Sequence, residues 1–179
     1  MHGLVFTQLK KYVTTKYDFS TWLTLLENAG LKGEIYVMSK IYPDEDLVKI
    51  VTAASEATKL PAAGIVEDFG MFLVPDLLKI YGAALDPSWK TLDTLEHVEN
   101  TIHKVVRVRD AAASPPKLIC KRLSPTIVEI TYTSERRLCA LAIGLAKGVA
   151  KHYDENIKII EPTCMLKGDS ECKLIITQH

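Results

Sequence analysis

The chain has 179 residues, of which 47% are hydrophobic and 25% are charged, an ordinary composition for a globular protein long enough to bury one sizeable core. Lys and Arg together number 22, as do Asp and Glu, so the formal net charge is zero, and basic residues stand together only in short pairs. A nucleic-acid-binding protein usually shows a basic excess or stripe, so we expect no nucleic-acid partner.

The N-terminal part of the chain has apolar residues at helical spacing. A first helix is expected over residues 3–17. A second is expected to begin at Ser20, which can act as its N-cap, and to stop at Gly30. The short apolar run over residues 35–38 fits either a strand or a bend.

Prolines mark the helices in the middle of the chain. Pro43 precedes three acidic residues, which is a favourable helix start. Pro61 opens a further helix, and Pro75 is expected to separate that helix from another apolar run, which ends at Gly82.

The last third of the chain changes character. The longest helix is expected over residues 91–108, followed by a loop over 110–116 and, later, by a helix over 135–153. β-Branched, roughly alternating segments predict strands at 117–122, 126–132, 157–160 and 172–177. We therefore predict an α+β fold, with a helical N-terminal part packed on a C-terminal part that holds a small antiparallel sheet of about four strands.

The N-terminus lacks the charged start and the cleavage site of a signal peptide. No apolar stretch approaches the ~20 residues that a membrane span needs. We therefore expect a stand-alone cytoplasmic domain without membrane insertion, in which the four cysteines are reduced or bound to metal.

Tyr132, Ser134 and Arg136 stand where a strand is expected to run into a helix. Ser134 is well placed as the N-cap, a helix start offers free N–H groups, and Arg136 adds a planar fork suited to a carboxylate. These residues can therefore form an anion site. Alternatively, Ser134 only caps the helix, Tyr132 is a half-buried strand residue, and Arg136 pairs with Glu135 or with solvent.

His103 lies 29 residues before Tyr132, on the flank of the apolar stripe of its helix. Most single helical histidines are surface residues or satisfied core residues. A zinc-protease helix is excluded, because no second histidine follows at i+4. One imidazole is nevertheless enough to ligate haem iron, because the porphyrin supplies the equatorial nitrogens.

The spacing of His103, Pro116 and the motif Tyr132-x-Ser134-x-Arg136 resembles that of the haem nitric oxide/oxygen-binding (H-NOX) domain family, bacterial stand-alone type, as does the N-terminal MHGLVF. In that family the matching histidine is the proximal iron ligand, the Tyr-Ser-Arg set holds the haem propionates, and the matching proline distorts the porphyrin. The resemblance implies the same roles for the residues of this chain.

The resemblance covers essentially the whole chain and implies a single haem-binding sensor domain over residues 1–179. A distal helical part would cover about 1–65 and a proximal α/β part about 66–179, with haem b between them. The implied function is that of a sensor and not of an enzyme. The sequence likewise contains no P-loop, no dinucleotide-binding glycine pattern and no nucleophile elbow.

The distal side of the haem decides which gas binds. Oxygen-binding members resemble one another in carrying a distal tyrosine, and the matching position here is Leu141. Bound oxygen needs a hydrogen-bond donor, whereas nitric oxide binds ferrous iron strongly without one. The candidate lining is apolar throughout and consists of Val5, Leu9, Phe69, Phe72, Val74, Leu141 and Leu145. We expect binding of NO and CO and poor binding of oxygen, although several of these residues also fit a plain core.

The mechanism that the resemblance implies is a ligand-driven release of strain. NO weakens or breaks the bond from iron to His103, the porphyrin relaxes from the shape that Pro116 imposes, and the helix bearing His103 shifts. The two conformers then differ in affinity for a signalling partner. Histidine kinases and cyclic-di-GMP enzymes are the usual partners of bacterial stand-alone members, and the sequence does not choose between them.

Cys139, Cys164 and Cys172 form a second constellation. Some family members resemble this pattern and bind zinc with three cysteines and a histidine. Here Glu161 stands at the position of that histidine, and carboxylate is less favoured than imidazole in such a site. The alternatives are buried structural cysteines or a thiol cluster that senses redox state, which would make the chain a dual haem and thiol sensor. Cys120 has no evident role.

A different class of function is a haem-free module that binds a hydrophobic small molecule. Vinyl-reductase-type ligand-binding domains show a similar cysteine pattern near the C-terminus, and in that interpretation His103 is incidental. His2 is a further open position, because it can either approach ferric iron on the distal side or remain solvated.

Overall fold

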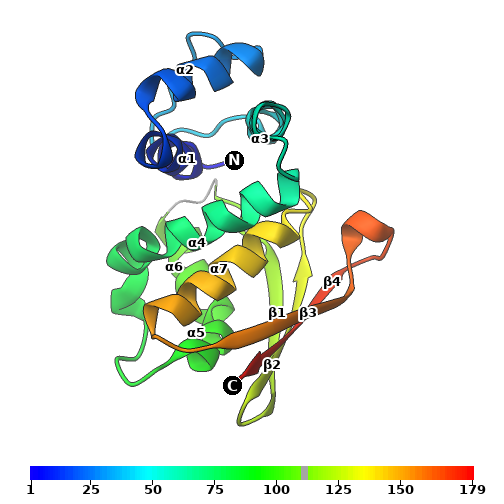
Figure 1. The fold of residues 1–179 in the computed structure, drawn as a ribbon. Coiled ribbons are helices and arrows are strands. Elements are labelled where there is room, and N and C mark those ends of the chain that lie inside the picture. The colour runs from blue at the N-terminus through cyan, green and yellow to red at the C-terminus, as the bar shows by residue number, and fades with distance from the viewer. Residues whose placement is uncertain (110–112) are drawn as a thin grey trace. The chain divides into compact units, whose positions relative to one another are not determined.

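The computed structural model describes residues 1–109 and 113–179, which form two compact units, Met1–Phe69 and Gly70–His179 (Figure 1). The first unit is helical, and the second combines helices with a sheet. Helix α4 (Ala62–Tyr81) begins in the first unit and continues in the second. Residues 110–112, part of the loop expected over 110–116, lie outside the described residues.

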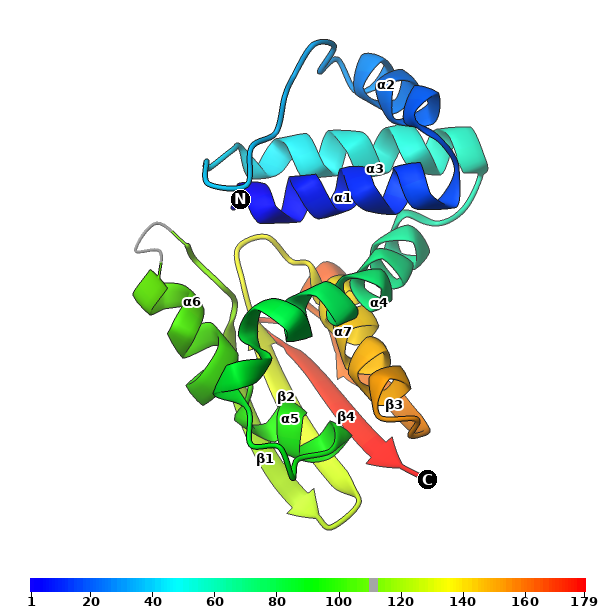
Figure 2. The same cartoon turned by 90° about the vertical axis from the view of Figure 1, so that its left-hand side faces the viewer.

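Helices of the first unit are α1 (Gly3–Lys16), α2 (Phe19–Asn28), α3 (Asp44–Thr58) and the start of α4 (Figure 2). Helix α2 packs against both α1 and α3. Their apolar faces form the core of this unit, where the side chains of Phe6, Leu26 and Ile50 are at most 3% exposed. The helices predicted over residues 3–17 and after Pro43 are therefore confirmed.

The cap of the second helix differs from the prediction, and the first helix has a cap that was not predicted. Helix α2 starts one residue before Ser20, and its N-cap is Asp18, whose carboxylate accepts the backbone N–H of Thr21 at 2.7 Å. The prediction of Ser20 as N-cap was wrong, because the charged carboxylate of Asp18 takes the capping position and Ser20 donates its hydroxyl to it. His2 is the N-cap of α1, since its Nδ1 accepts the N–H of Leu4 at 3.1 Å.

Residues 35–38 form neither helix nor strand. The hydroxyl of Tyr42 accepts the N–H of Val37 at 2.7 Å and donates to the carbonyl of Ile35 at 3.1 Å. A tyrosine side chain therefore holds this segment in a bend, which is one of the alternatives that the sequence left open.

Helix α4 runs without a break through Pro75, so the separation predicted there was wrong. Pro75 cannot donate to the carbonyl of Met71, one turn earlier. That carbonyl faces α7 (Cys139–His152), where a Cβ built on Gly148 would lie 3.0 Å from it. Close packing on α7 keeps the helix continuous where local sequence alone favours a break.

The sheet of the second unit has strands β1 (Lys117–Ser124), β2 (Ile127–Thr133), β3 (Ile157–Thr163) and β4 (Cys172–Gln178). Their order is β1-β2-β4-β3, and every neighbouring pair is antiparallel. The pairing of β2 with β4 sets Tyr132 opposite Cys172. The predicted α+β class and the four-stranded antiparallel sheet are confirmed.

Helices α4, α5 (Thr91–His97) and α7 cover one face of this sheet (Figure 2). The buried cluster between them and the sheet contains Val74, Leu92, Leu95, Val128, Ile130, Ala146, Val149, Leu174 and Ile176. Helix α7 begins at Cys139, four residues later than predicted, because residues 134–138 form a turn before it.

The helix predicted over residues 91–108 is interrupted. After α5 the chain forms a π-helical turn over Glu99–His103 and then α6 (Lys104–Arg109). This segment is also not the longest helix, since α4 has 20 residues. Arg122 on β1 anchors α5 through Asp93 at 2.6 Å and Glu96 at 2.8 Å, whereas no residue of the π turn or of α6 is fully buried.

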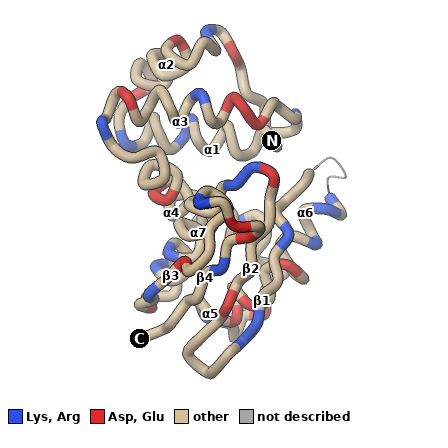
Figure 3. The backbone as a smooth tube through the Cα atoms, turned by 90° about the vertical axis from the view of Figure 1, so that its right-hand side faces the viewer, with Lys and Arg blue, Asp and Glu red and all other residues tan. Residues whose placement is uncertain are grey.

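Among the described residues, Lys and Arg are interspersed with Asp and Glu along the backbone in the view of Figure 3. Among the helices of residues 1–109 and 113–179, none is long and apolar enough to cross a membrane.

Candidate functional site

His103 occupies the last position of the π-helical turn, where its backbone N–H donates to the carbonyl of Val98 at 3.0 Å, an i to i−5 bond. Single π-helical turns occur often at functional sites, because the extra residue re-aims side chains relative to an α-helix. The imidazole is 15% exposed. Its Nδ1 lies 2.8 Å from a carboxylate oxygen of Glu99, which leaves Nε2 as the nitrogen that can face a metal.

Burial lowers the pKa of His103, and the hydrogen bond to Glu99 offsets only part of this effect. The imidazole is therefore neutral at pH 7, the form that ligates a metal. With Nδ1–H donated to a carboxylate, the tautomer that keeps the lone pair on Nε2 is favoured. The donor set at this position fits an iron ligand.

Glu99 is a residue whose importance the sequence reasoning missed. Its carboxylate also accepts from Arg107 Nη2 at 2.7 Å and from the backbone N–H of Leu118 on β1 at 3.3 Å. Burial raises the pKa of Glu99, but the hydrogen bonds from His103 and Arg107 outweigh burial, and the pKa lies below its usual value. The only signal in the sequence was the i, i+4 spacing of Glu99 and His103.

Ser134 does not cap α7, which corrects the prediction. Its hydroxyl accepts the N–H of Arg136 at 3.3 Å and its carbonyl accepts the N–H of Arg137 at 3.1 Å, so a turn forms here. Arg137 has φ of 50°, in the left-handed region, which delays the helix. The N-cap of α7 is Leu138, and the N–H groups of Arg136, Arg137 and Leu138 are used within the turn.

Tyr132 is almost completely buried, with 3% exposure, and its hydroxyl accepts the N–H of Leu138 at 3.1 Å. Burial raises the pKa of this phenol, while hydrogen bonds from Ser134 and Leu138 act in the opposite direction. The hydroxyls of Tyr132 and Ser134 therefore belong to one hydrogen-bonded turn.

Arg136 donates from Nη1 to the carbonyl of Ser114 at 2.5 Å. The alternatives of pairing with Glu135 or solvent did not anticipate this bond, which joins the turn to the segment just before Pro116. Pro116 is itself half-buried next to the start of β1. The motif residues and Pro116 are thus close in space although they are far apart in sequence.

Leu141 and Leu145, the candidate distal residues of α7, are half-buried and apolar. They lie at the close contact of α7 with α4, where a Cβ built on Gly70 would approach the carbonyl of Leu141 to 2.7 Å and the N of Leu145 to 3.0 Å. Val5 is a half-buried residue of α1, in the first unit. Among the other predicted lining residues, Leu9, Phe69 and Val74 are core residues with at most 3% exposure.

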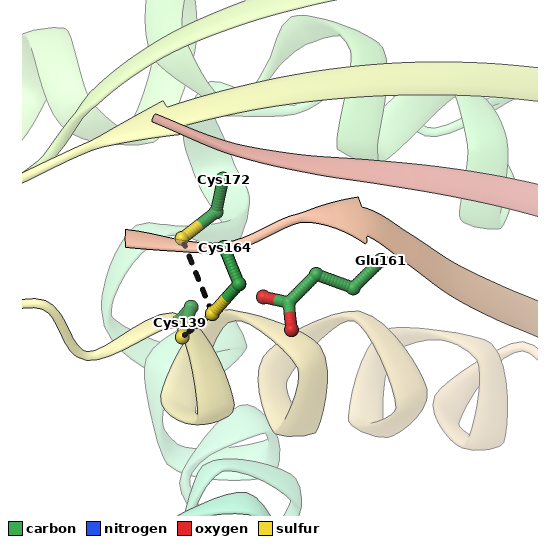
Figure 4. Close-up of side chains that lie close together, drawn as sticks. All are labelled: Cys139, Glu161, Cys164 and Cys172. Carbon is green, nitrogen blue, oxygen red and sulfur yellow. Dashed lines mark hydrogen bonds between the residues drawn. The ribbon is translucent and has the colours of Figure 1, made fainter. Parts of the chain in front are cut away.

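The fold brings together the four residues of the second constellation, as the family resemblance implied. Cys139 at the start of α7, Glu161 on β3, Cys164 and Cys172 bring one ligand atom each to within 4.8 Å of one another (Figure 4). Cys164 Sγ lies 3.6 Å from Cys139 Sγ and 4.0 Å from Cys172 Sγ. Tetrahedral zinc with Zn–S bonds of about 2.3 Å places its sulfurs ~3.8 Å apart, so these distances suit zinc.

The charge state of this cluster also fits a cation. Oε1 of Glu161 is buried without a hydrogen-bond partner, a costly arrangement for a carboxylate unless a cation faces it. Burial raises the pKa of both Cys139 and Cys172, so without a metal these thiols are protonated. The same thiols can alternatively serve as an oxidisable cluster, since their sulfurs are adjacent. Cys120 lies apart from them, half-buried on β1.

A family model described as "Haem-NO-binding" matches residues 2–161, which is most of the chain. The chain therefore belongs to the haem-NO-binding family, that of the H-NOX domains. Members of this family bind haem and diatomic gases and regulate partner proteins, and H-NOX domains are sensors rather than enzymes.

Similar structures support the same assignment. An H-NOX protein from S. oneidensis in the Fe(II)NO ligation state matches with a TM-score of 0.93 and 30% identity, over 100% of this chain and 99% of that one. The Fe(II) unliganded H-NOX protein from K. algicida shares the fold, with a TM-score of 0.87 and 20% identity, over 100% of this chain and 97% of that one.

A curated relative is the soluble guanylate cyclase gcy-31 of Caenorhabditis elegans, which is 23% identical over 138 residues. This match covers 76% of the present chain and 20% of the cyclase. The chain thus spans about a fifth of the length of that relative, and no catalytic domain of a cyclase is contained in the matched part.

Proposed function

We propose that this protein is a haem-based sensor of NO, which also binds CO and binds oxygen poorly, with His103 as the proximal ligand of haem b. The observation that carries the proposal is the placement of His103 on a π-helical turn, with Nδ1 bonded to Glu99 and Nε2 left for iron. Tyr132, Ser134 and Arg136 would hold the propionates.

The selectivity for gases is argued from the candidate distal residues. Val5, Leu141 and Leu145 carry no hydrogen-bond donor in their side chains. A bound oxygen molecule acquires negative charge and is stabilised by a donor in a dry site, whereas NO does not depend on one. Apolar residues at these positions therefore favour NO and CO over oxygen.

Haem would supply a ferrous iron that binds NO, and His103 would hold that iron. Movement of His103 on release would act on the segment between α5, anchored by Arg122, and α6. Pro116, beside β1, would press on the ring and store the strain that this movement releases. The partner would be a signalling protein such as a histidine kinase or a cyclic-di-GMP enzyme, and the cytoplasmic location stays a prediction.

An absorption spectrum of the reduced protein, before and after addition of NO, tests this proposal in the wild type and in His103→Ala. We expect the Soret band of a five-coordinate ferrous haem in the wild type and its loss, or its rescue by added imidazole alone, in His103→Ala. His97→Ala is the matched control, because His97 lies on the same helical segment but stacks on Trp89 at 4.4 Å between ring centroids. Wild-type protein that takes up no haem after reconstitution would refute the proposal.

We also propose that Cys139, Glu161, Cys164 and Cys172 hold a structural zinc ion. The unpartnered Oε1 of Glu161 beside three thiols supports this assignment. A redox-sensing thiol cluster is the competing interpretation, and absence of zinc from protein purified without chelators would favour it.

One observation favours the haem-free alternative. The first unit contains an apolar cavity of about 330 Å³ between α1, α2, α3 and the start of α4, with Tyr12, Lys16 and Asp68 as its main polar residues. Its volume and lining suit a small hydrophobic molecule with one polar group. Haem uptake with the expected spectrum in the wild type would exclude this reading as the main function.

A further inference from the structure

The carboxylate of Glu99 gathers donors from three places in the second unit. Oε2 accepts from His103 Nδ1 at 2.8 Å and from the backbone N–H of Leu118 at 3.3 Å, and Oε1 accepts from Arg107 at 2.7 Å. Leu118 belongs to β1, whereas His103 and Arg107 belong to the helical segment. One side chain thus connects the candidate iron ligand to the sheet.

This arrangement is held in a defined orientation. The side chains of Glu99 and His103 are only 21% and 15% exposed, so their hydrogen bond is largely shielded from water. Oε2 accepts from Leu118 as well as from His103, and Oε1 accepts from Arg107. These additional bonds prevent the carboxylate from rotating away from His103. A shielded bond between an imidazole N–H and a carboxylate is stronger than its counterpart in water.

Such a bond changes the imidazole as a ligand. When Nδ1–H is donated to a carboxylate, electron density on Nε2 rises and the ring becomes a stronger donor to a metal. Arg107 acts in the opposite sense, because its positive charge at Oε1 draws electron density away from the carboxylate and weakens the hold on His103. Glu99 would therefore strengthen the bond from His103 Nε2 to a metal, and Arg107 would reduce that effect.

We propose that Glu99 is a positioning residue that sets the strength of the bond from His103 to haem iron, with Arg107 moderating it, and thereby sets how readily NO releases His103. This inference rests on the proposed function, since it requires His103 to be the iron ligand. A movement of His103 would also be transmitted to β1, because the carboxylate that holds His103 accepts the N–H of Leu118.

The alternative is a purely structural role, in which Glu99 only attaches the helical segment to β1. The two roles predict different responses. Removing either Glu99 or Arg107 would weaken such an attachment, so both variants would shift the spectroscopic properties of the haem in the same direction. If Glu99 and Arg107 instead have opposite effects on the bond from His103 to iron, the two variants should shift these properties in opposite directions.

The test measures the frequency of the Fe–His stretching band by resonance Raman spectroscopy of the unliganded ferrous holoprotein. Glu99→Gln keeps the size and an acceptor but removes the charge, so we expect a lower frequency. Arg107→Gln should raise it. Glu96→Gln is the matched control, because Glu96 is a carboxylate of the same segment that pairs with Arg122 and makes no bond to His103.

A second readout is the fraction of protein in which NO has displaced His103, taken from the Soret band of the NO complex. The equilibrium constant for this displacement should rise ~10-fold in Glu99→Gln, the lower end of the effect of removing such a partner, and should fall in Arg107→Gln. Unshifted bands in Glu99→Gln, or shifts of the same sign in both variants, would overturn the inference.

The outcomes separate this inference from the proposed function. A wild-type Fe–His band that is absent, or that survives in His103→Ala, refutes the assignment of His103 itself. A wild-type band that depends on His103 but does not respond to Glu99→Gln refutes only the role of Glu99. If Glu99→Gln fails to fold, Arg107→Gln still distinguishes the two roles of Glu99. A higher Fe–His stretching frequency in that variant supports the proposal, and a lower one supports the purely structural role.

Discussion

Arg136 and Ser114 are joined by a hydrogen bond of 2.5 Å between a guanidinium nitrogen and a backbone carbonyl oxygen, across 22 positions of sequence. The bond ties the turn that follows β2 to the segment that leads into Pro116 and β1. It places the only arginine of the Tyr-x-Ser-x-Arg motif next to the residue expected to press on the porphyrin.

This placement predicts a role for the fork of Arg136 in retaining haem. In Arg136→Lys the charge remains but the planar fork is lost, so paired hydrogen bonds to a carboxylate can no longer form. We expect haem to be lost about tenfold faster to an excess of a haem-accepting protein, because a charge-assisted hydrogen bond contributes about 1.5 kcal/mol. Arg137→Lys, at the adjacent exposed position, should retain haem at the wild-type rate, and equal rates for both variants would contradict this role.

The residue at position 141 should decide whether oxygen binds. Leu141→Tyr introduces a hydroxyl donor at the position that matches the distal tyrosine of oxygen-binding family members, so we expect a longer-lived oxygen complex of the reduced protein in air. Leu141→Phe adds a ring of nearly the same size without the hydroxyl and should not show this gain. Absorption spectra recorded over time after reduction provide the measurement, and a stable oxygen complex of the wild type would contradict the proposed selectivity.

Two glycines of the same helix, α4, should respond oppositely to alanine. In Gly70→Ala the new Cβ would lie 2.7 Å from the carbonyl oxygen of Leu141, so α4 and α7 must separate, and we expect a loss of about 1–3 kcal/mol of stability. In Gly64→Ala nothing lies within 4 Å of the new Cβ, and the lower entropy of the unfolded chain should stabilise the protein by about 0.5–1 kcal/mol. Urea unfolding monitored by circular dichroism measures the free energy of unfolding of both variants. Equal free energies for Gly70→Ala and Gly64→Ala would contradict the close contact of α4 with α7.

Zinc affinity should depend on the ligand at position 161. Glu161→His supplies the imidazole that zinc prefers beside three thiolates and should bind zinc more tightly, whereas Glu161→Ala should bind it more weakly. Competition with a chromophoric chelator measures both affinities. Glu171→Ala is a suitable control, because Glu171 pairs with Lys173. If all variants hold zinc equally, Glu161 is not a ligand.

The half-buried thiol of Cys120 should make the protein less stable at high pH. Burial, followed by the negative charges of Glu99 and Glu96, raises the pKa of Cys120 from its ordinary value of 9.0 to about 12. Since the folded state holds this proton more tightly than the unfolded state, the stabilisation is complete below pH 9 and is lost as pH rises toward 12. Between pH 9 and 12 the melting temperature of Cys120→Ala should therefore fall less steeply with pH than that of the wild type. Equal slopes for the two proteins would contradict the raised pKa of Cys120.

Much of the fold follows from local patterns in the sequence. The helices of the first unit, the two strand pairs and the late helix all have the periodicity that their structures require, because periodicity depends on residues a few positions apart. His103 and the Tyr132-x-Ser134-x-Arg136 motif were selected in another way, by their resemblance to the H-NOX family, and their roles stay predictions. Errors occurred at boundaries, as at Asp18 and Leu138, where competing caps are separated by one or a few residues.

The tertiary structure decided what depends on distant parts of the chain. Packing of α4 on Gly148 keeps the helix continuous through Pro75, against its local preference. The extra residue of the π turn, and the bond from Leu118 that makes Glu99 a partner of both His103 and the sheet, arise only when the helical segment docks on β1. The sequence by itself therefore determined which elements form and which residues are candidates for chemistry, while long-range packing determined how those residues are aimed, because the direction of a side chain depends on contacts that no local pattern encodes.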